Sequence, residues 1–344
     1  MTDAPSAPSS LGGIRGARQR TAPASDSLVR TSFFDETQSL PMIVEPARPG
    51  VDLAEWARAN HAQVEAWIHQ YGSLYFRGFG IVDAELFETT ANALAGEDLF
   101  GDYGDLPREA AGEKIFGSTP YPADQAIFFH CESSHLPHWP MRIFFNCAIN
   151  AETGGETPVL DTRVAYRELD PIVREKFERL GLRYTRNFAD GIDVPWQQFF
   201  GTDSQEEVEQ KCREADTDFE WLKDGAQLRI SQLVDGVRTH PDTGEKVFFN
   251  QVLLHHPAAL PPATRDALRQ LLSEEDLPRN VYYGDGSTIP DEDIQAIFDV
   301  YDRITSAHRW DQGGVIMLDN MLCSHARLPF TGPRKTLVAM ARIV

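Results

Sequence analysis

Apolar and polar residues are arranged at two spacings along the chain, and each spacing predicts a different element. Apolar positions three and four residues apart give a helix one buried face. Helical patterns of this kind occur over 53–70, 83–96, 163–180, 204–215, 263–274 and 291–306. Short β-branched and aromatic runs are typical of strands. Such runs occur over 40–46, 73–79, 126–130, 142–149, 157–160, 227–233, 246–251, 314–318 and 335–343.

The strand predicted at 126–130 leads directly into His130-Cys131-Glu132. Alternate side chains of a strand face the same side, so we expect His130 and Glu132 to point together and Cys131 to point away. A histidine and a glutamate at this spacing also occur by chance. The alternative interpretation is therefore a hydrogen-bonded core histidine beside a solvated glutamate.

A second buried strand, at 315–318, ends in the turn pair Asp319-Asn320, and His325 lies just past it. Two imidazoles and one carboxylate form the facial ligand set of non-haem Fe(II) oxygenases, which leaves metal positions open for a co-substrate and O2. We therefore predict an iron site formed by His130, Glu132 and His325.

Two further segments suggest how an acidic co-substrate is held. Gly154-Gly155 permits a tight turn close to a ligand, and Thr157 follows it with a hydroxyl group. Arg334 lies nine residues past His325, and a guanidinium can pair with a carboxylate through two hydrogen bonds. The alternatives are an ordinary hairpin turn and a surface ion pair, which contributes little.

The spread of these candidates along the chain predicts one domain. Helices precede the first half of the candidate site, and strands flank both halves, so we expect a mainly β, sandwich-type core with helical elaboration over 28–344 and a helical insert at about 163–225. Residues 1–27 are rich in Ala, Ser, Pro and Gly, and this composition predicts a disordered N-terminal extension. A transit peptide is the alternative.

Composition and net charge limit the classes of partner that the protein can bind. The formal net charge of −20 over 344 residues argues against binding to nucleic acid or to anionic membranes. No apolar run approaches the roughly 18–20 residues of a membrane span. The four cysteines show no CxxC spacing and fit free thiols in a reducing compartment, so we expect a cytoplasmic protein. These cysteines are Cys131, Cys147, Cys212 and Cys323.

Taken together, the motifs resemble the taurine dioxygenase superfamily of Fe(II)/2-oxoglutarate-dependent oxygenases. The matching motifs are His130-x-Glu132, the Gly-Gly-Glu-Thr run ending at Thr157, Asp319-Asn320 ahead of His325, and Gly-Pro-Arg334-Lys335. The closer resemblance is to the branch that includes the syringomycin-pathway aspartyl hydroxylase. Further segments that resemble this branch are 74–79, 139–145, 183–188, 240–245 and 282–286. The resemblance covers about residues 30–344.

This resemblance implies a double-stranded β-helix (jelly-roll) core flanked by helices. It implies Fe(II) held by His130, Glu132 and His325, and the co-substrate 2-oxoglutarate held by Thr157 and Arg334. The resemblance also implies that the enzyme uses O2 to hydroxylate an unactivated C–H bond. The expected substrate is an amino acid, free or tethered to a carrier protein, in specialised peptide metabolism such as antibiotic biosynthesis. Related halogenases carry a small residue at the position of Glu132, so we expect hydroxylation here, with desaturation or epoxidation as alternatives.

Several polar side chains are candidates for orienting the small-molecule substrate, and each also has a structural interpretation. These candidates are Arg77, His135, Arg186, Asn187, Asn250 and Arg327.

Two other classes of protein are alternatives to the oxygenase. A zinc hydrolase could use a similar ligand set, but the chain lacks the HExxH motif in which its general base usually lies. A non-catalytic jelly-roll binding protein could retain a vestigial site.

Overall fold

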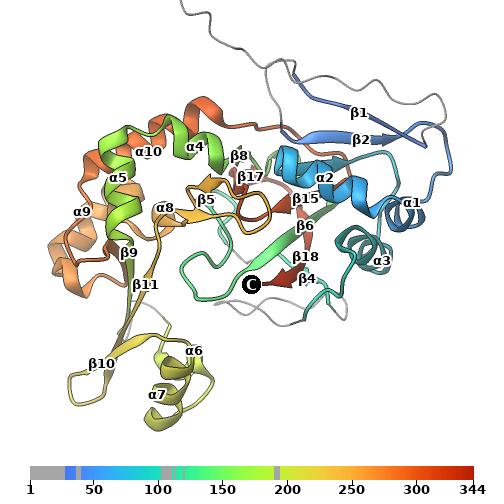
Figure 1. Ribbon diagram of the computed structural model, residues 1–344. Coiled ribbons are helices and arrows are strands. Elements are labelled where there is room, and N and C mark those ends of the chain that lie inside the picture. The colour runs from blue at the N-terminus through green and yellow to red at the C-terminus, as the bar shows by residue number, and fades with distance from the viewer. Residues whose placement is uncertain (1–27, 36–39, 102–110, 112–113, 119–120, 190–193) are drawn as a thin grey trace, which may run out of the picture.

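The molecule has a β core with helices packed on two sides, as the computed structural model shows (Figure 1). The structure describes residues 28–35, 40–101, 111, 114–118, 121–189 and 194–344. The extension predicted at 1–27 lies outside these residues.

The largest sheet of the described residues has seven strands, in the order β1-β2-β3-β15-β6-β18-β4. All neighbours pair antiparallel except β2 and β3, which are parallel. The bounds are β1 (Val29–Ser32), β2 (Met42–Pro46), β3 (Ser73–Phe76), β15 (Val315–Asp319), β6 (Pro140–Ile149), β18 (Lys335–Ile343) and β4 (Phe116–Gly117). The order places the final strands beside the early ones, so the two ends of the domain form one sheet.

Strand β15 shows how this sheet supports two apolar layers. Val315 and Met317 are buried in a cluster with residues of helices α1, α2 and α3. Ile316 and Leu318 are buried in a different cluster, which includes Phe145 of β6. Because side chains alternate along a strand, one face of the large sheet carries helices and the other faces a second sheet.

The second sheet has the order β5-β16-β8 and is antiparallel throughout. Its strands are β5 (Ile127–His130), β16 (Cys323–Arg327) and β8 (Val159–Asp161), and the adjacent pair is β17 (Phe330–Thr331) with β7 (Thr153–Gly154). Val159 and Cys323 from this sheet share the apolar cluster of Ile316 and Phe145. Two sheets therefore enclose one core, as expected of a jelly roll.

A third sheet, in the order β10-β11-β9-β14, runs through the region expected to be a helical insert. Its strands are β10 (Asp218–Leu222), β11 (Gln227–Val234), β9 (Leu182–Phe188) and β14 (Arg279–Tyr283), with β12 (Arg238–Thr239) and β13 (Lys246–Val247) as a separate short pair. Leu182 and Tyr184 of β9 are buried with Val281 and Tyr283 of β14. This period-two pairing overrides the helical expectation for part of 163–225.

The helices that the sequence pattern predicts lie at the expected positions, but two of them are each divided into two shorter helices. Their bounds are α1 (Leu53–Ala59), α2 (His61–Tyr71), α3 (Ala84–Ala95), α4 (Thr162–Glu168), α5 (Pro171–Leu180), α6 (Trp196–Phe200), α7 (Gln205–Glu214), α8 (Val252–His255), η1 (Pro257–Ala259), α9 (Pro262–Leu271), η2 (Glu274–Asp276) and α10 (Asp291–Ile304). The helix predicted over 53–70 is two helices, and the first is capped by Asp52. The helix predicted over 163–180 is interrupted because Asp170 caps α5 and Pro171 occupies its first position.

The helices gather in two groups around the sheets. Figure 1 shows α1, α2 and α3 on the right, where they pack on one face of the large sheet, and α4, α5 and α10 together on the left of the molecule. The second group encloses its own apolar cluster with β9 and β14. None of the described helices has the length and apolar composition needed to cross a bilayer.

Candidate metal centre

The two candidate histidines lie directly opposite each other on neighbouring strands. His130 ends β5, and its antiparallel partner across the sheet is His325 of β16. Their ring centroids are 4.3 Å apart. The sequence placed His325 just past a strand, whereas it lies in the middle of β16. The short β15–β16 turn returns the chain into the second sheet sooner than the sequence pattern indicated.

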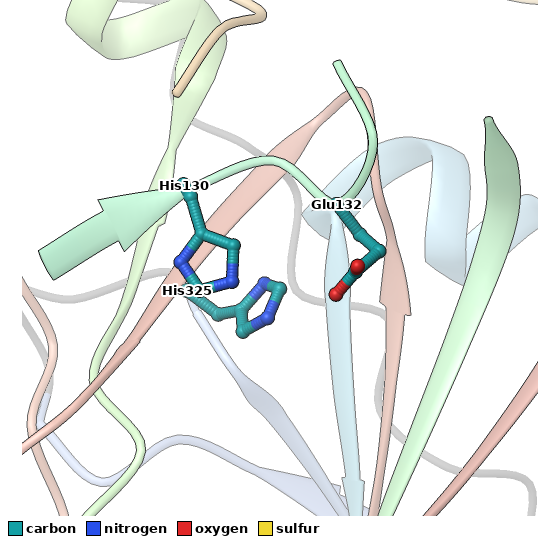
Figure 2. A group of neighbouring side chains, drawn as sticks. All are labelled: His130, Glu132 and His325. Atoms are coloured by element: carbon teal, nitrogen blue, oxygen red, sulfur yellow. The ribbon is translucent and has the colours of Figure 1, made fainter. Parts of the chain in front are cut away.

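Glu132 lies beyond the end of β5, in a turn whose next residue, Ser133, has a φ of 56°. Its carboxylate nevertheless points toward the same space as the two imidazoles (Figure 2). Cys131 is fully buried in a separate apolar cluster with Trp139. The expected arrangement of these side chains is present, but a turn rather than strand alternation produces it.

One ligand atom from each of His130, Glu132 and His325 lies within 4.8 Å of the others. The Nδ1 atom of His130 is 2.9 Å from the main-chain oxygen of Phe128. A carbonyl oxygen only accepts, so Nδ1 carries the proton and Nε2 keeps its lone pair. A hydrogen bond of this kind fixes the orientation and tautomer of many metal-binding histidines. Nitrogen and carboxylate donors at this separation fit a divalent transition metal.

A cavity of about 70 Å³ opens at the three side chains. Its lining also contains both residues predicted to hold a co-substrate, Thr157 and Arg334. The full lining is Ser118, Ile127, His130, Glu132, Phe145, Thr157, His325, Ala326, Arg327, Arg334, Thr336 and Val338. Residues from four strands and three separate sequence regions therefore meet in one cavity.

Arg334 is held against the glycine turn that precedes Thr157. Its Nε donates to the main-chain oxygen of Gly155 at 3.0 Å, and its Nη2 is 3.5 Å from Oγ1 of Thr157. A Cβ atom on Gly155, whose φ is 75°, would lie 3.0 Å from Cδ of Arg334, so this position favours glycine. Burial, with a smaller effect of nearby Arg327, lowers the pKa of Arg334 to about 10. The guanidinium is still charged at neutral pH, in an environment that favours an anionic partner.

Five of the six candidate substrate residues are absent from the lining of this cavity, and three of these five use their side chains elsewhere. Arg77 forms an ion pair with Glu45 at 2.9 Å. Asn187 donates to the main-chain oxygens of Glu275 and Leu277. Asn250 accepts from the main-chain N–H of Val252.

The other three candidates line cavities. Arg327 lines the cavity at the metal ligands, but its guanidinium donates to the main-chain oxygens of Tyr121, Pro122 and Gln125. His135 and Arg186 line a second cavity together with Tyr184, Phe199 and His255.

Phe145 lies at the site, although the sequence analysis did not single it out. Its ring lies 5.1 Å from that of His325, and it lines the cavity. The run of apolar residues in β6 hid this role, because alternation within a strand buried on both faces gives no sign of which face carries a cavity.

Comparison with known proteins agrees with this geometry. Residues 36–341 match the family model described as taurine catabolism dioxygenase TauD, TfdA family. The chain belongs to this family and is a 2-oxoglutarate-dependent dioxygenase that uses iron and O2. The dapdiamide synthesis protein DdaC of Enterobacter agglomerans is 35% identical over 281 residues, which cover 82% of this chain and 85% of that protein. A clavaminate synthase-like protein of Arabidopsis thaliana is 25% identical, over 89% of this chain and 95% of that protein.

Solved structures show the same fold. The PvcB protein of Pseudomonas aeruginosa superposes with a TM-score of 0.56 at 16% identity, covering 94% of each chain. A second PvcB structure, described as an Fe, alpha-ketoglutarate dependent oxygenase from an isonitrile synthetic pathway, gives a TM-score of 0.55 at 16% identity and the same coverage. The predicted jelly-roll core flanked by helices is therefore confirmed.

Proposed function

We propose that His130, Glu132 and His325 hold the iron, that Thr157 and Arg334 hold 2-oxoglutarate, and that the enzyme hydroxylates an unactivated C–H bond of a small amino-acid-type substrate. The observation that carries the proposal is the shared cavity. It joins three ligand atoms within 4.8 Å of one another to a buried guanidinium. A zinc hydrolase has no use for that guanidinium.

Each side chain has a separate task. Bound iron and 2-oxoglutarate supply the oxidising chemistry, and the protein supplies orientation and a shielded pocket. The carbonyl of Phe128 keeps Nε2 of His130 free of a proton, and Glu132 contributes the negative charge that partly neutralises the metal. Phe145 places an apolar ring beside His325 in the wall of the cavity.

Arg334 suits the distal carboxylate of a dicarboxylic keto acid. Its Nε donates to the main-chain oxygen of Gly155, while its Nη2 lies near the hydroxyl of Thr157. A carboxylate there accepts charge-assisted hydrogen bonds from the guanidinium and one from the threonine hydroxyl. Because burial disfavours an isolated charge, this carboxylate also offsets the cost that lowers the pKa of Arg334.

The substrate class rests on relatives and on the second cavity. DdaC is named for dapdiamide synthesis, and PvcB is described as an oxygenase from an isonitrile synthetic pathway, so the supported context is specialised biosynthesis. The turn that carries Glu132 leads directly to His135, which lines the second cavity with Arg186. We assign this cavity to the substrate, free or carrier-tethered.

The four buried free thiols support a cytoplasmic location.

The proposal is tested by anaerobic reconstitution with Fe(II), followed by 2-oxoglutarate, ascorbate and air, with amino acids and carrier-bound aminoacyl groups as candidate substrates. We expect succinate release coupled to a product one oxygen atom heavier. A product two hydrogen atoms lighter would instead indicate desaturation. Zinc in place of iron as the metal that supports turnover would refute the oxygenase assignment.

Turnover in the presence of chloride should give no chlorinated product. Glu132 occupies the ligand position through which a halide would otherwise reach the metal, and its carboxylate lies among the ligand atoms. Mass spectrometry of the product in chloride and in chloride-free buffer checks this. A chlorine isotope pattern would show that Glu132 is not a ligand during turnover.

His135→Ala should raise the KM for the substrate while leaving the KM for 2-oxoglutarate unchanged. His135 lines the second cavity and not the one that contains Arg334. Loss of one polar contact is worth about 1 kcal/mol, which corresponds to roughly a fivefold rise in KM. Steady-state kinetics with each substrate varied in turn measures both constants. An unchanged substrate KM would remove His135 from the site.

A further inference from the structure

One buried side chain holds the main chain of Glu132 on both sides. Oδ1 of Asn320 accepts from the N–H of Glu132 at 2.8 Å, and Nδ2 of Asn320 donates to the main-chain oxygen of Glu132 at 2.9 Å. The same Nδ2 donates to the oxygen of Pro140 at 2.9 Å. Asn320 is fully buried. Because Glu132 lies outside β5, these bonds take the place of a strand ladder at this residue.

Asn320 is itself fixed by its neighbour. Oδ1 of Asp319 accepts from the main-chain N–H groups of Met321 and Leu322, both at 3.0 Å. Oδ2 of Asp319 accepts from Arg142 at 2.5 Å and lies 3.1 Å from Nε2 of His240. The turn between β15 and β16 is therefore tied to β6 and to the segment around His240, and the amide of Asn320 has a fixed direction.

The contacts demand a primary amide. An amide side chain presents an acceptor and a two-proton donor at once, and here the acceptor faces an N–H and the donor faces two carbonyl oxygens. An aspartate has nearly the same shape but turns the donor into a second acceptor, which would face those carbonyl oxygens without a proton. An alanine leaves buried main-chain groups unpaired.

We propose that Asn320 is a positioning residue that sets the place of the Glu132 carboxylate in the iron site. Asn320 lies in the short connection that leads into β16, five residues before His325. The same turn therefore leads to one histidine ligand and fixes the carboxylate ligand, which lies 188 residues earlier in the chain. The inference rests on the proposed iron site and adds that the ligand set is assembled before metal arrives.

The chain offers a matched control in Asn146 of β6. Asn146 is also fully buried, and its Nδ2 also donates to two main-chain oxygens, those of Ile81 and Gly314. It holds no candidate ligand. Asn146→Asp therefore reproduces the chemical change of Asn320→Asp at a site that serves the fold alone.

The first test is anaerobic Fe(II) affinity, measured by competition with a chelator, together with thermal unfolding of the metal-free proteins. We expect Asn320→Asp and Asn320→Ala to weaken Fe(II) binding by about 10–100-fold, the usual effect of removing a group that orients a ligand. Asn146→Asp should bind Fe(II) like the wild type even where it unfolds at a lower temperature. Wild-type affinity in the folded Asn320 variants would overturn the proposal.

The second test uses the wild-type protein and does not depend on how the variants fold. In the metal-free enzyme, hydrogen exchange resolved to the amide of Glu132 should show strong protection, although this residue is not in a strand. Exchange at the rate of an exposed amide would overturn the proposed clamp. If wild type and His325→Ala bind iron equally, the iron site itself is wrong, and that outcome is distinct from failure of the Asn320 variants alone.

Discussion

His325→Ala should abolish stoichiometric Fe(II) binding and, with it, succinate formation. The substitution removes one of three ligands, so the loss should exceed the roughly 10–100-fold typical of removing a group that only orients a ligand. His325 is buried in β16 opposite His130, and no other His, Cys, Asp or Glu of the described residues joins the group that surrounds the predicted metal position. Anaerobic titration with Fe(II), followed by metal analysis after desalting, measures the effect.

A matched control for this variant is His256→Ala. His256 is also buried, and its Nε2 lies 3.0 Å from the main-chain oxygen of Ile289. Its loss should lower the unfolding temperature and leave Fe(II) affinity intact. Equal iron binding by His325→Ala and wild type would remove His325 from the ligand set.

Arg334→Ala should raise the KM for 2-oxoglutarate by about 10–100-fold and change kcat little. A hydrogen bond to a charged group is worth about 1.5–3 kcal/mol, and every 1.4 kcal/mol is about tenfold in affinity. The distal carboxylate is held equally in the ground and transition states, so its loss appears in KM. Steady-state kinetics over a wide range of 2-oxoglutarate concentrations gives both constants.

Arg334→Lys separates charge from geometry in the same assay. Lysine keeps the positive charge but cannot form the bidentate hydrogen bonds of a guanidinium. The KM of this variant for 2-oxoglutarate should therefore lie between those of wild type and Arg334→Ala. Wild-type KM in the alanine variant would show that another basic group holds the keto acid. The candidates for that group are Arg327, Lys335 and Arg342, of which Arg327 lines the cavity.

The candidate site was predictable in the parts that depend on residue type and order. His130 and Glu132 lie at the end of a run of residues typical of a strand. Thr157 follows the glycine turn at 154–155, and Arg334 directly precedes the strand predicted at 335–343. The structure brings all of these with His325 to one cavity. Their order along the chain carried the family resemblance, which the match over residues 36–341 confirms.

The remaining features depend on tertiary contacts that have no local signal. Asn320 was expected to end a strand, and its partner Glu132 is 188 residues away. Arg327 was expected to orient substrate, and its guanidinium is instead satisfied by main-chain oxygens of 121–125. A polar side chain of either kind looks the same in the sequence whether it binds substrate or closes a loop.

The strand that the sequence analysis missed, β9, also depends on tertiary contacts. The strand at 182–188 contains Arg183, Arg186 and Asn187, which weaken its strand signal. It is stabilised by pairing with both β11 and β14, and β14 begins at Arg279, far along the chain. Helix caps leave a clearer local signal in the sequence: Asp52 immediately precedes the helical pattern at 53–70, and its side chain accepts from the N–H of Glu55.

An anaerobic crystal structure with Fe(II) and 2-oxoglutarate, with anomalous scattering recorded at the iron edge, tests the central claim most directly. The account predicts a single strong iron peak in contact with His130, Glu132 and His325, and the distal carboxylate of the keto acid against Arg334 and Thr157. Iron bound at other side chains, or a keto acid bound with that carboxylate away from Arg334, would contradict it.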